Sequence, residues 1–437
     1  MSRFAIRALF LSIVLVMLLG IHSEARTWSS FVGDSDFTSY YTAACLVRSH
    51  LNSYVYEEAG QNIDPIQKKA DPNTLFARTA RVRGIPTVAL YDYPPTLADL
   101  LKPFTFLSPS TALVGWLLIN AAALLATGVM LIRMTGVEFS GVARFVLLLL
   151  FIFRPTLDCF FYGQISIILL FLLVAGLSLY AQGKKTSAAL LFALAAAIKL
   201  TPLIMLIPLL AWRDWKTLRA FAMWCAAILG AMLVINGPGA LGMYFLHELP
   251  AISSGAVDKL NKSLATAVQV FWSGSDASVP LPGVVWAGRL FSFAVLVYAG
   301  WLSRLKNGEK LMDRQRLRMV AVFLLLSCCL SPVSWVHAYV LSIPALMILG
   351  LRIWRGRSNA FEAALGVWFV VSLTSDKLFG WAATTGQPIF YYLEVMTPII
   401  GLILGILELS RLRHERNLER RDGIEAAAIR PQFETAQ

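Results

Sequence analysis

The sequence has little charge and few features that would stabilise a small secreted domain. Only 15% of its 437 residues are charged and 57% are apolar, which is far from the composition of soluble globular proteins. Its five cysteines form no CxxC pair and no disulfide framework, and the chain has no convincing internal repeat. These absences exclude a disulfide-rich fold and a cysteine-based metal site, and they weigh against a transporter made of two similar halves.

Long apolar runs take the place of the missing charge. A hydrocarbon core about 30 Å thick needs roughly 20 apolar residues per helix, so the chain is predicted to be an all-α polytopic membrane protein. We expect spans near residues 4–22, 112–132, 143–157, 164–181, 186–211, 218–236, 285–303, 317–331, 338–353, 360–374 and 391–411. The first run follows basic residues and resembles a signal peptide; we favour an uncleaved first helix, with a cleaved signal as the alternative.

The run at 186–211 is interrupted at its middle. Lys199, Thr201 and Pro202 break the apolar pattern, and a proline disfavours helix in the residue before it. Lys185 precedes the run and Arg213 follows it, so both flanks are basic and both are expected on the cytoplasmic side. An even number of crossings satisfies this condition. We therefore predict two short helices that meet at Lys199, and about twelve spans in all.

The remaining basic residues also fall in short loops and in the C-terminal tail. The net charge of +12 is therefore a topology signal, and no nucleic-acid partner is expected. We predict one membrane domain over 1–411 with extracytoplasmic loops at 23–111 and 237–284, a cytoplasmic tail at 412–437, and both termini in the cytoplasm. Amphipathic stretches at 42–51 and 72–81 predict helices lying along the membrane surface.

Polar clusters gather on the predicted outer face, where each is a candidate site. Asp34 and Asp36 follow the first span, and a partly desolvated carboxylate there is a candidate general base; the alternative is an N-cap for the next helix. Tyr93 lies in the rigid turn at 91–95, and the alternative for that turn is an interfacial aromatic belt. Gln164 can bond sugar hydroxyls, or it can simply begin a helix.

Cationic and donor groups occupy the later outer segments. Lys199 within a broken apolar helix is expected to meet an anion such as a lipid phosphate, with snorkelling to the interface as the alternative. His337 can donate to a phosphate oxygen, although a lone histidine is often structural. Asn261 and Trp335 complete the set of candidate substrate contacts.

Taken together, six motifs resemble glycosyltransferase family 87, the polyprenyl-phosphate-dependent mannosyltransferase type with a GT-C fold. They are DFTSYYTAA at 36–44, YPPT at 93–96, YGQIS at 162–166, KLTP at 199–202, NKSL at 261–264 and SPVSWVHAYV at 331–340, and they occur in the family's order. The resemblance implies that Asp36 is the catalytic base, with Asp34 as its alternative, and that Lys199 and His337 contact the donor phosphate. It also makes Tyr40, in the first motif, a candidate substrate contact.

The resulting prediction is a membrane glycosyltransferase of the bacterial inner membrane, active on the periplasmic side. It is expected to move a hexose, with mannose favoured, from a polyprenyl-phosphate donor to a glycan or glycolipid acceptor, with inversion at the anomeric carbon. Outer carboxylates are too scattered to predict a metal site, so no metal or other cofactor is expected. The alternatives are a secondary transporter and a flippase for lipid-linked sugars.

Overall fold

The computed structural model describes residues 35–59, 69–136, 150–255, 261–273, 281–306, 309, 311–378 and 395–434. Across these ranges every regular element is a helix, and strand-like pairing is limited to two isolated bridges, Lys69 with Ala89 and Asn261 with Trp335. The all-α prediction is confirmed for this part of the chain. The predicted outer segment forms α2 (Asp36–Arg48), the 3-10 helix η2 (Asn52–Tyr56), α3 (Leu75–Val82), α4 (Pro95–Leu101) and the 3-10 helix η3 (Lys102–Phe106).

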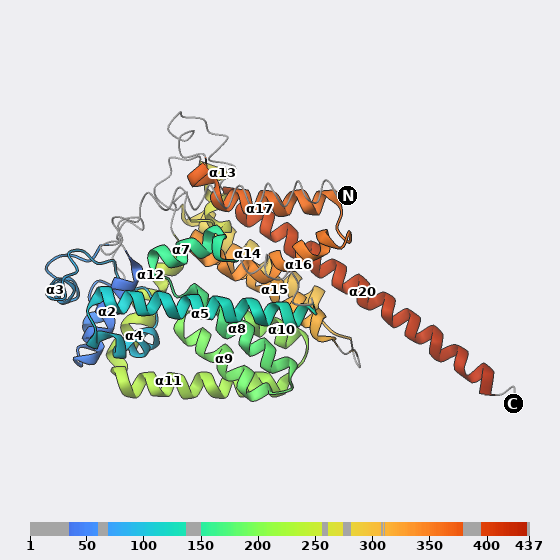
Figure 1. Cartoon of the computed structure of the whole chain (residues 1–437), viewed down its shortest axis with the longest axis horizontal. Helices are drawn as coiled ribbons and strands as arrows, with labels where there is room; N and C mark the ends of the chain where they lie inside the picture. Colours follow the sequence, from blue (N-terminus) through green and yellow to red (C-terminus); the bar gives the residue numbers. More distant parts are fainter. Residues whose placement is uncertain are drawn as a thin grey trace.

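The apolar runs form the body of the molecule. Its elements are α5 (Pro109–Thr135), α7 (Arg154–Tyr162), α8 (Ser166–Ala181), α9 (Lys185–Ile198), η4 (Thr201–Met205), α10 (Leu206–Ala211), α11 (Trp215–Met243), the π-helix η5 (Tyr244–Glu248), α12 (Leu249–Ser253), α13 (Leu264–Ser273), α14 (Pro282–Ser303), α15 (Asp313–Leu330), η6 (Val336–Ser342), α16 (Ile343–Trp354), α17 (Ala360–Leu378) and α20 (Thr397–Glu434). Figure 1 shows α5, α8, α9 and α11 running alongside one another, with α2, α3 and α4 at one end.

Several of these helices are long and apolar enough to cross a membrane. Within the described ranges they are Pro109–Thr135, Trp215–Ser253, Pro282–Ser303 and Val336–Trp354, and α7 with α8 adds a fifth if that pair, bent by 120°, counts as one span. The predicted span at 4–22 and residues 143–149 of the span at 143–157 lie outside the described residues. Twelve spans therefore stay a prediction, while a membrane protein with several apolar helices is supported.

The chain reverses direction at Lys199, as predicted. Helix α9 ends at Ile198, Lys199 is extended with φ −151° and ψ 139°, and Pro202 begins the following 3-10 helix. The Lys185 ammonium at the start of α9 lies 2.8 Å from the carboxylate of Asp214, the residue that caps α11. Because this ion pair joins the two ends of the segment, α9 and α10 form a hairpin, and Lys199 lies at its tip.

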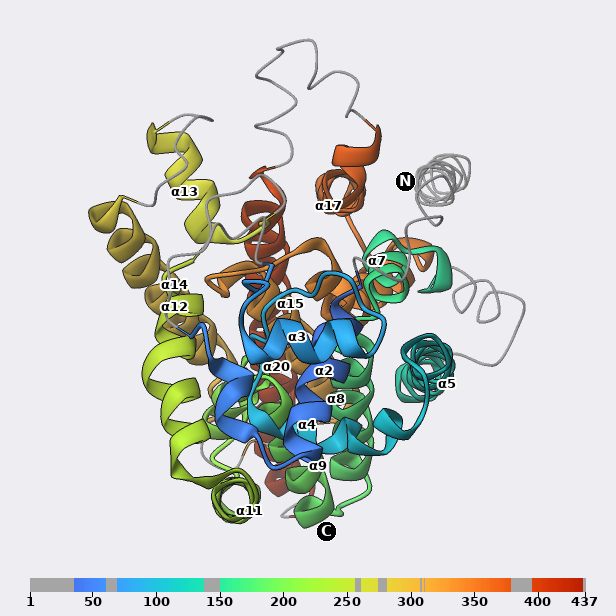
Figure 2. The same ribbon diagram turned by 90° about the vertical axis from the view of Figure 1, so that its left-hand side faces the viewer.

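Helix α2 corrects one expectation. The stretch 42–51 was predicted to lie along the membrane surface, but it does not form a separate surface helix: α2 runs from Asp36 to Arg48, and all its side chains from Phe37 to Val47 are buried. Small and aromatic side chains let it pack inside the outer layer against α3, α4 and η3. Figure 2 views this end directly and shows α2, α3 and α4 in front of α8 and α9. Helix α3 does keep an exposed face, opposite Phe76, Ala77 and Ala80.

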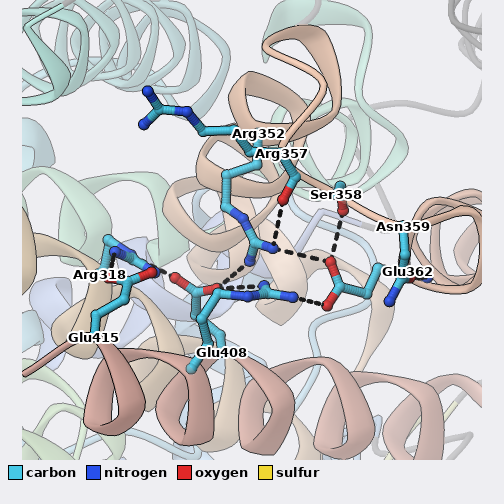
Figure 3. A network of polar contacts seen from close by, with 9 residues as sticks. Arg318, Arg352, Arg357, Ser358, Asn359, Glu362, Glu408 and Glu415 are labelled. Atoms are coloured by element: carbon cyan, nitrogen blue, oxygen red, sulfur yellow. Dashed lines mark hydrogen bonds and ion pairs between the residues drawn. The ribbon is translucent and has the colours of Figure 1, made fainter. Parts of the chain in front are cut away.

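The loops predicted to be cytoplasmic meet on one face. Arg318 bonds both Glu408 and Glu415, and Arg352 bonds both Glu362 and Glu408, which connects α15, α16, α17 and α20 (Figure 3). The orientation of this face relative to the membrane stays a prediction. The expected division at residue 411 is not a break in the helix, because α20 continues to Glu434 and projects from the body (Figure 1).

Candidate active site

A cavity of about 1250 Å³ opens between the outer helices and the helical body. Its lining comes from α2, the turn before α4, α7, the reversal after α9, α12, α15 and η6. Seven of the nine residues proposed from sequence line it: Asp36, Tyr40, Tyr93, Gln164, Lys199, Trp335 and His337. Asp34 lies outside the described residues, and Asn261 is not part of the lining. Asp36 and His337, which are 301 positions apart in the chain, thus line the same cavity.

The carboxylate of Asp36 points across the cavity and does not cap its own helix. Ser35 is the N-cap of α2, and its hydroxyl accepts the hydrogen bond from the Phe37 amide at 3.2 Å. The Asp36 carboxylate instead accepts a hydrogen bond from the side-chain amide of Gln164. Ser35 therefore caps α2, and the carboxylate of Asp36 lines the cavity.

Gln164 is held in one orientation by two tyrosines. The hydroxyls of Tyr40 and Tyr93 donate to its amide oxygen at 2.9 and 3.1 Å, and the two hydroxyl oxygens lie 3.0 Å from each other. Burial raises the pKa of both tyrosines well above the ordinary value, so both hydroxyls stay protonated donors. With its oxygen occupied by two donors, the amide turns its NH₂ group toward Asp36.

A left-handed glycine brings Gln164 to this position. Gly163 ends α7 with φ 64°, which glycine adopts without strain, and its carbonyl accepts a 2.7 Å hydrogen bond from the Trp116 indole. A Cβ at this position would lie 2.7 Å from that of Phe37. The close approach of α7 to α2 therefore depends on glycine at position 163. This approach places Gln164 beside Asp36, the residue before Phe37.

The environment of Asp36 suits a base that acts near neutral pH. Burial raises the pKa of its carboxyl from the ordinary 3.8 to about 7. The Gln164 hydrogen bond and the charge of Lys199 oppose this rise, whereas the negative charge of Asp92 adds to it. A carboxylate with a pKa near 7 is ionised in about half of the molecules at pH 7 and takes up a proton more readily than an ordinary aspartate.

The turn at 91–95 is part of the protein core and not an exposed belt. Tyr91 is buried, its hydroxyl donates to the Pro94 carbonyl at 2.8 Å, and the Ala98 amide donates back to it at 3.0 Å. The Tyr56 hydroxyl also holds the Tyr93 carbonyl at 2.6 Å. These bonds fix the turn and direct the Tyr93 side chain into the cavity wall.

Lys199 lies beside this network. Its ammonium nitrogen is 5.3 Å from the centre of the Tyr93 ring, within reach of a cation–π interaction, and the residue lines the cavity. His337 lines the same cavity from η6, and its backbone carbonyl accepts a 3.4 Å contact from the Cys159 thiol of α7. The hairpin tip and η6 thus bring a cation and an imidazole to one chamber.

Asn261 has a supporting position. Its amide oxygen accepts from the Ser334 backbone at 2.8 Å, and its NH₂ donates to the Pro332 carbonyl at 3.2 Å. The Lys262 amide bonds the Ser334 carbonyl at 2.8 Å in the same contact. Asn261 therefore holds the turn that carries Trp335 and His337, and its predicted contact with substrate stays a prediction.

Two charged residues of the cavity wall were not singled out from sequence as site residues. Arg154 and Asp158 both line the cavity from α7 and form a 2.8 Å ion pair, with exposed side-chain fractions of 4% and 5%. The signal that pointed to Arg154 was available, because an arginine beside a long apolar run is costly in a membrane and is by default a functional hypothesis.

Comparison with known proteins relates the chain to mannosyltransferases. A phosphatidylinositol mannoside mannosyltransferase of Mycobacterium tuberculosis H37Rv, named as polyprenol-phosphate-mannose-dependent and alpha-(1-2), is 28% identical over 292 residues, which span 62% of this chain and 64% of that relative. A protein of the same name from Mycolicibacterium smegmatis is 25% identical over 347 residues, 72% of this chain and 76% of its own. The chain thus spans less than two thirds of the first relative.

The family comparison covers the middle of the chain. Residues 91–332, more than half of the chain, match the family described as glycosyltransferase family 87. This range contains Tyr93, Gln164 and Lys199, whereas Asp36 and His337 lie outside it. The resemblance inferred from six short motifs is therefore confirmed, and the chain belongs to glycosyltransferase family 87.

Proposed function

We propose that the protein is a polyprenyl-phosphate-dependent mannosyltransferase of GT-C architecture with about twelve spans. It would act on the extracytoplasmic side of the bacterial plasma membrane and transfer mannose to a glycolipid or glycan. The observation that carries the proposal is the cavity in which Asp36, with a pKa near 7, faces the same space as Lys199 and His337. The named relatives support a lipid-linked mannose donor and a phosphatidylinositol mannoside as the kind of acceptor.

The chemistry is a single displacement. Asp36 takes the proton of an acceptor hydroxyl, the hydroxyl oxygen forms a bond to the anomeric carbon, and the bond from that carbon to the phosphate oxygen breaks. The electron pair leaves with the polyprenyl phosphate, whose negative charge increases as the bond breaks, and Lys199 and His337 stabilise that charge. One base and a leaving group that needs no proton are sufficient, and attack opposite the leaving group inverts the configuration.

The walls of the cavity also suit a donor that arrives from lipid. Leu203 and Ile207 from the hairpin, Leu249 and Ile252 from α12, and Leu296 from α14 line one part of it. The polar network of Asp36, Gln164 and Tyr93 lines the same cavity. Apolar side chains of this kind favour a prenyl chain, because burying each methylene contributes about 0.8 kcal/mol. The polar side chains are suited to the sugar.

The test is mannose transfer from synthetic polyprenyl-phosphate-mannose by membranes containing the wild type or Asp36→Asn at matched expression, with a mixed glycolipid extract as acceptor. We expect the variant to lose about 10²- to 10⁴-fold in rate, the usual contribution of a general base. Asp71→Asn is the control, because Asp71 lies in the same outer segment but outside the cavity lining. Full activity of Asp36→Asn would move the base to Asp34 or elsewhere, and no transfer by wild type would remove the support for this donor.

A further inference from the structure

Tyr93 contacts both the base side and the cation side of the site. Its hydroxyl donates to the amide oxygen of Gln164 at 3.1 Å, and the NH₂ group of that amide bonds the Asp36 carboxylate. The Lys199 ammonium nitrogen lies 5.3 Å from the centre of the Tyr93 ring. One amide group therefore connects the phenol to the base, while the ring of the same side chain contacts the cation. The mechanism proposed above gives Tyr93 no role.

The position of Tyr93 is fixed without the help of Lys199. Its carbonyl accepts the 2.6 Å hydrogen bond from the Tyr56 hydroxyl, and its ring meets the Tyr40 ring at 5.0 Å and nearly at a right angle. Aromatic rings attract each other in this arrangement. Lys199 is extended, and a lysine carries its charge at the end of a flexible four-carbon stem. The ring is therefore the fixed partner, and the ammonium is the group that the contact positions.

A neutral ring can hold an ammonium without cancelling its charge. Lys185 shows the other arrangement, because its ammonium lies 2.8 Å from the Asp214 carboxylate and its charge is balanced inside the protein. An aromatic ring attracts a cation through its quadrupole, and the cation keeps its full charge toward a third group. Lys199 lines the cavity, so an anionic ligand can supply that group. A tyrosine partner thus suits a lysine that binds and releases phosphate.

We propose that Tyr93 is a positioning residue whose ring holds the Lys199 ammonium where that ammonium meets the donor phosphate. Its hydroxyl has a second, separate effect, because together with that of Tyr40 it keeps the Gln164 amide turned toward the base. The inference rests on the proposed function for the identity of the donor. The ring should act on phosphate binding, and the pair of hydroxyls should act on the protonation of Asp36.

Binding of farnesyl phosphate and of farnesol to the full-length protein in detergent tests the ring, because the two probes share a prenyl tail and differ in the phosphate. We expect Tyr93→Leu to lower the affinity for farnesyl phosphate about 2- to 30-fold, a range set by the strength of a cation–π contact, and to leave farnesol binding unchanged. Tyr93→Phe keeps the ring and should bind both probes as wild type does. Lys199→Met should also lose affinity for farnesyl phosphate. Adding Tyr93→Leu to it should cause little further loss, because the ring then has no cation to hold.

The pH dependence of kcat/KM for mannose transfer tests the hydroxyls. Tyr93→Phe alone should keep the acidic limb of wild type, because the Tyr40 hydroxyl still bonds the Gln164 oxygen. Tyr40→Phe with Tyr93→Phe should move that limb to higher pH, because the amide can then turn away and a carboxylate that loses its donor has a raised pKa. This double variant keeps both rings, so it should bind farnesyl phosphate as wild type does. A purely structural role would not separate phosphate affinity from the acidic limb in this way.

The matched control is Tyr180→Leu. The Lys185 ammonium lies 5.5 Å from the Tyr180 ring, but Tyr180 is outside the cavity lining, so this variant should bind both probes as wild type does. Equal loss of both probes in Tyr93→Leu, no loss of either, or the same further loss when Lys199 is already methionine would each overturn the effect of the ring. A wild type without preference for farnesyl phosphate would overturn it too.

An acidic limb that stays in place in Tyr40→Phe with Tyr93→Phe would overturn the effect of the hydroxyls. Ring-dependent binding of farnesyl phosphate would uphold the inference about Lys199 even if no mannose transfer were found. Mannose transfer by wild type, with Tyr93→Leu equal to it in phosphate binding, would overturn that inference and leave the proposed function standing. The two proposals therefore fail separately.

Discussion

The hydrogen bond from Gln164 to Asp36 gives the sharpest prediction about the chemistry. A hydrogen bond to a charged group contributes about 1.5–3 kcal/mol, and about 1.36 kcal/mol corresponds to one pKa unit. Gln164→Met keeps the length of the side chain but removes the N–H donor that stabilises the carboxylate. The pKa of Asp36 should therefore rise from about 7 by a further 1–2 units.

The sign of the effect on rate follows from the ionised fraction. The base acts in its deprotonated form, so wild-type kcat/KM should rise with pH and level off above about pH 7. In Gln164→Met the ionised fraction at pH 7 falls from about one half to between about one tenth and one hundredth, a 5- to 50-fold loss of kcat/KM. Near pH 9 the variant should come within about twofold of wild type.

The assay is the pH dependence of mannose transfer at subsaturating donor. Tyr40→Phe is the control, because it removes one donor to the Gln164 oxygen and leaves the bond to Asp36 in place. Its acidic limb should stay near that of wild type. A Gln164→Met profile that is lowered equally at every pH would refute the reasoning, since it would mean that the amide does not set the pKa of the base.

Two further predictions concern stability and packing. Gly163→Ala should lower both the thermal midpoint in detergent and the transfer rate, because the new Cβ would lie 2.7 Å from the Cβ of Phe37. The control is Gly183→Ala, where φ is 79° and no atom lies within 4 Å of the new Cβ. This variant should lose only about 1–2 kcal/mol of unfolding free energy and keep the transfer rate. Glu408→Gln should cost about 3 kcal/mol of unfolding free energy, because Arg318, Arg352 and Arg411 lose their shared carboxylate (Figure 3). Glu415→Gln, 37% exposed, should cost less than about 1 kcal/mol. Equal rates for the two glycine variants, or equal midpoints for the two glutamate variants, would contradict these expectations.

The reversal at Lys199 shows how much a local pattern can predict. A proline and basic residues on both flanks were enough to predict two short helices that meet at Lys199, and the end of α9 at Ile198 with the extended Lys199 after it confirms the break. Helix-breaking and loop charge are properties of short stretches, so they can be read from sequence. Surface placement of 42–51 was predicted wrongly, because side-chain periodicity does not specify which other helices cover an apolar segment.

Composition and the order of six short motifs determined the membrane class, the helical fold and the family, and they named most of the residues around the cavity. The tertiary structure decided which of those residues contact one another and how burial changes their pKa values. Gln164 lies 128 positions from Asp36, yet their contact and the burial around them set the pKa of the carboxyl. The assignment of Asn261 to a supporting turn and of Arg154 to the cavity wall likewise needed three-dimensional contacts. Burial and long-range hydrogen bonds depend on how distant segments pack, and no local stretch of the chain encodes that packing by itself.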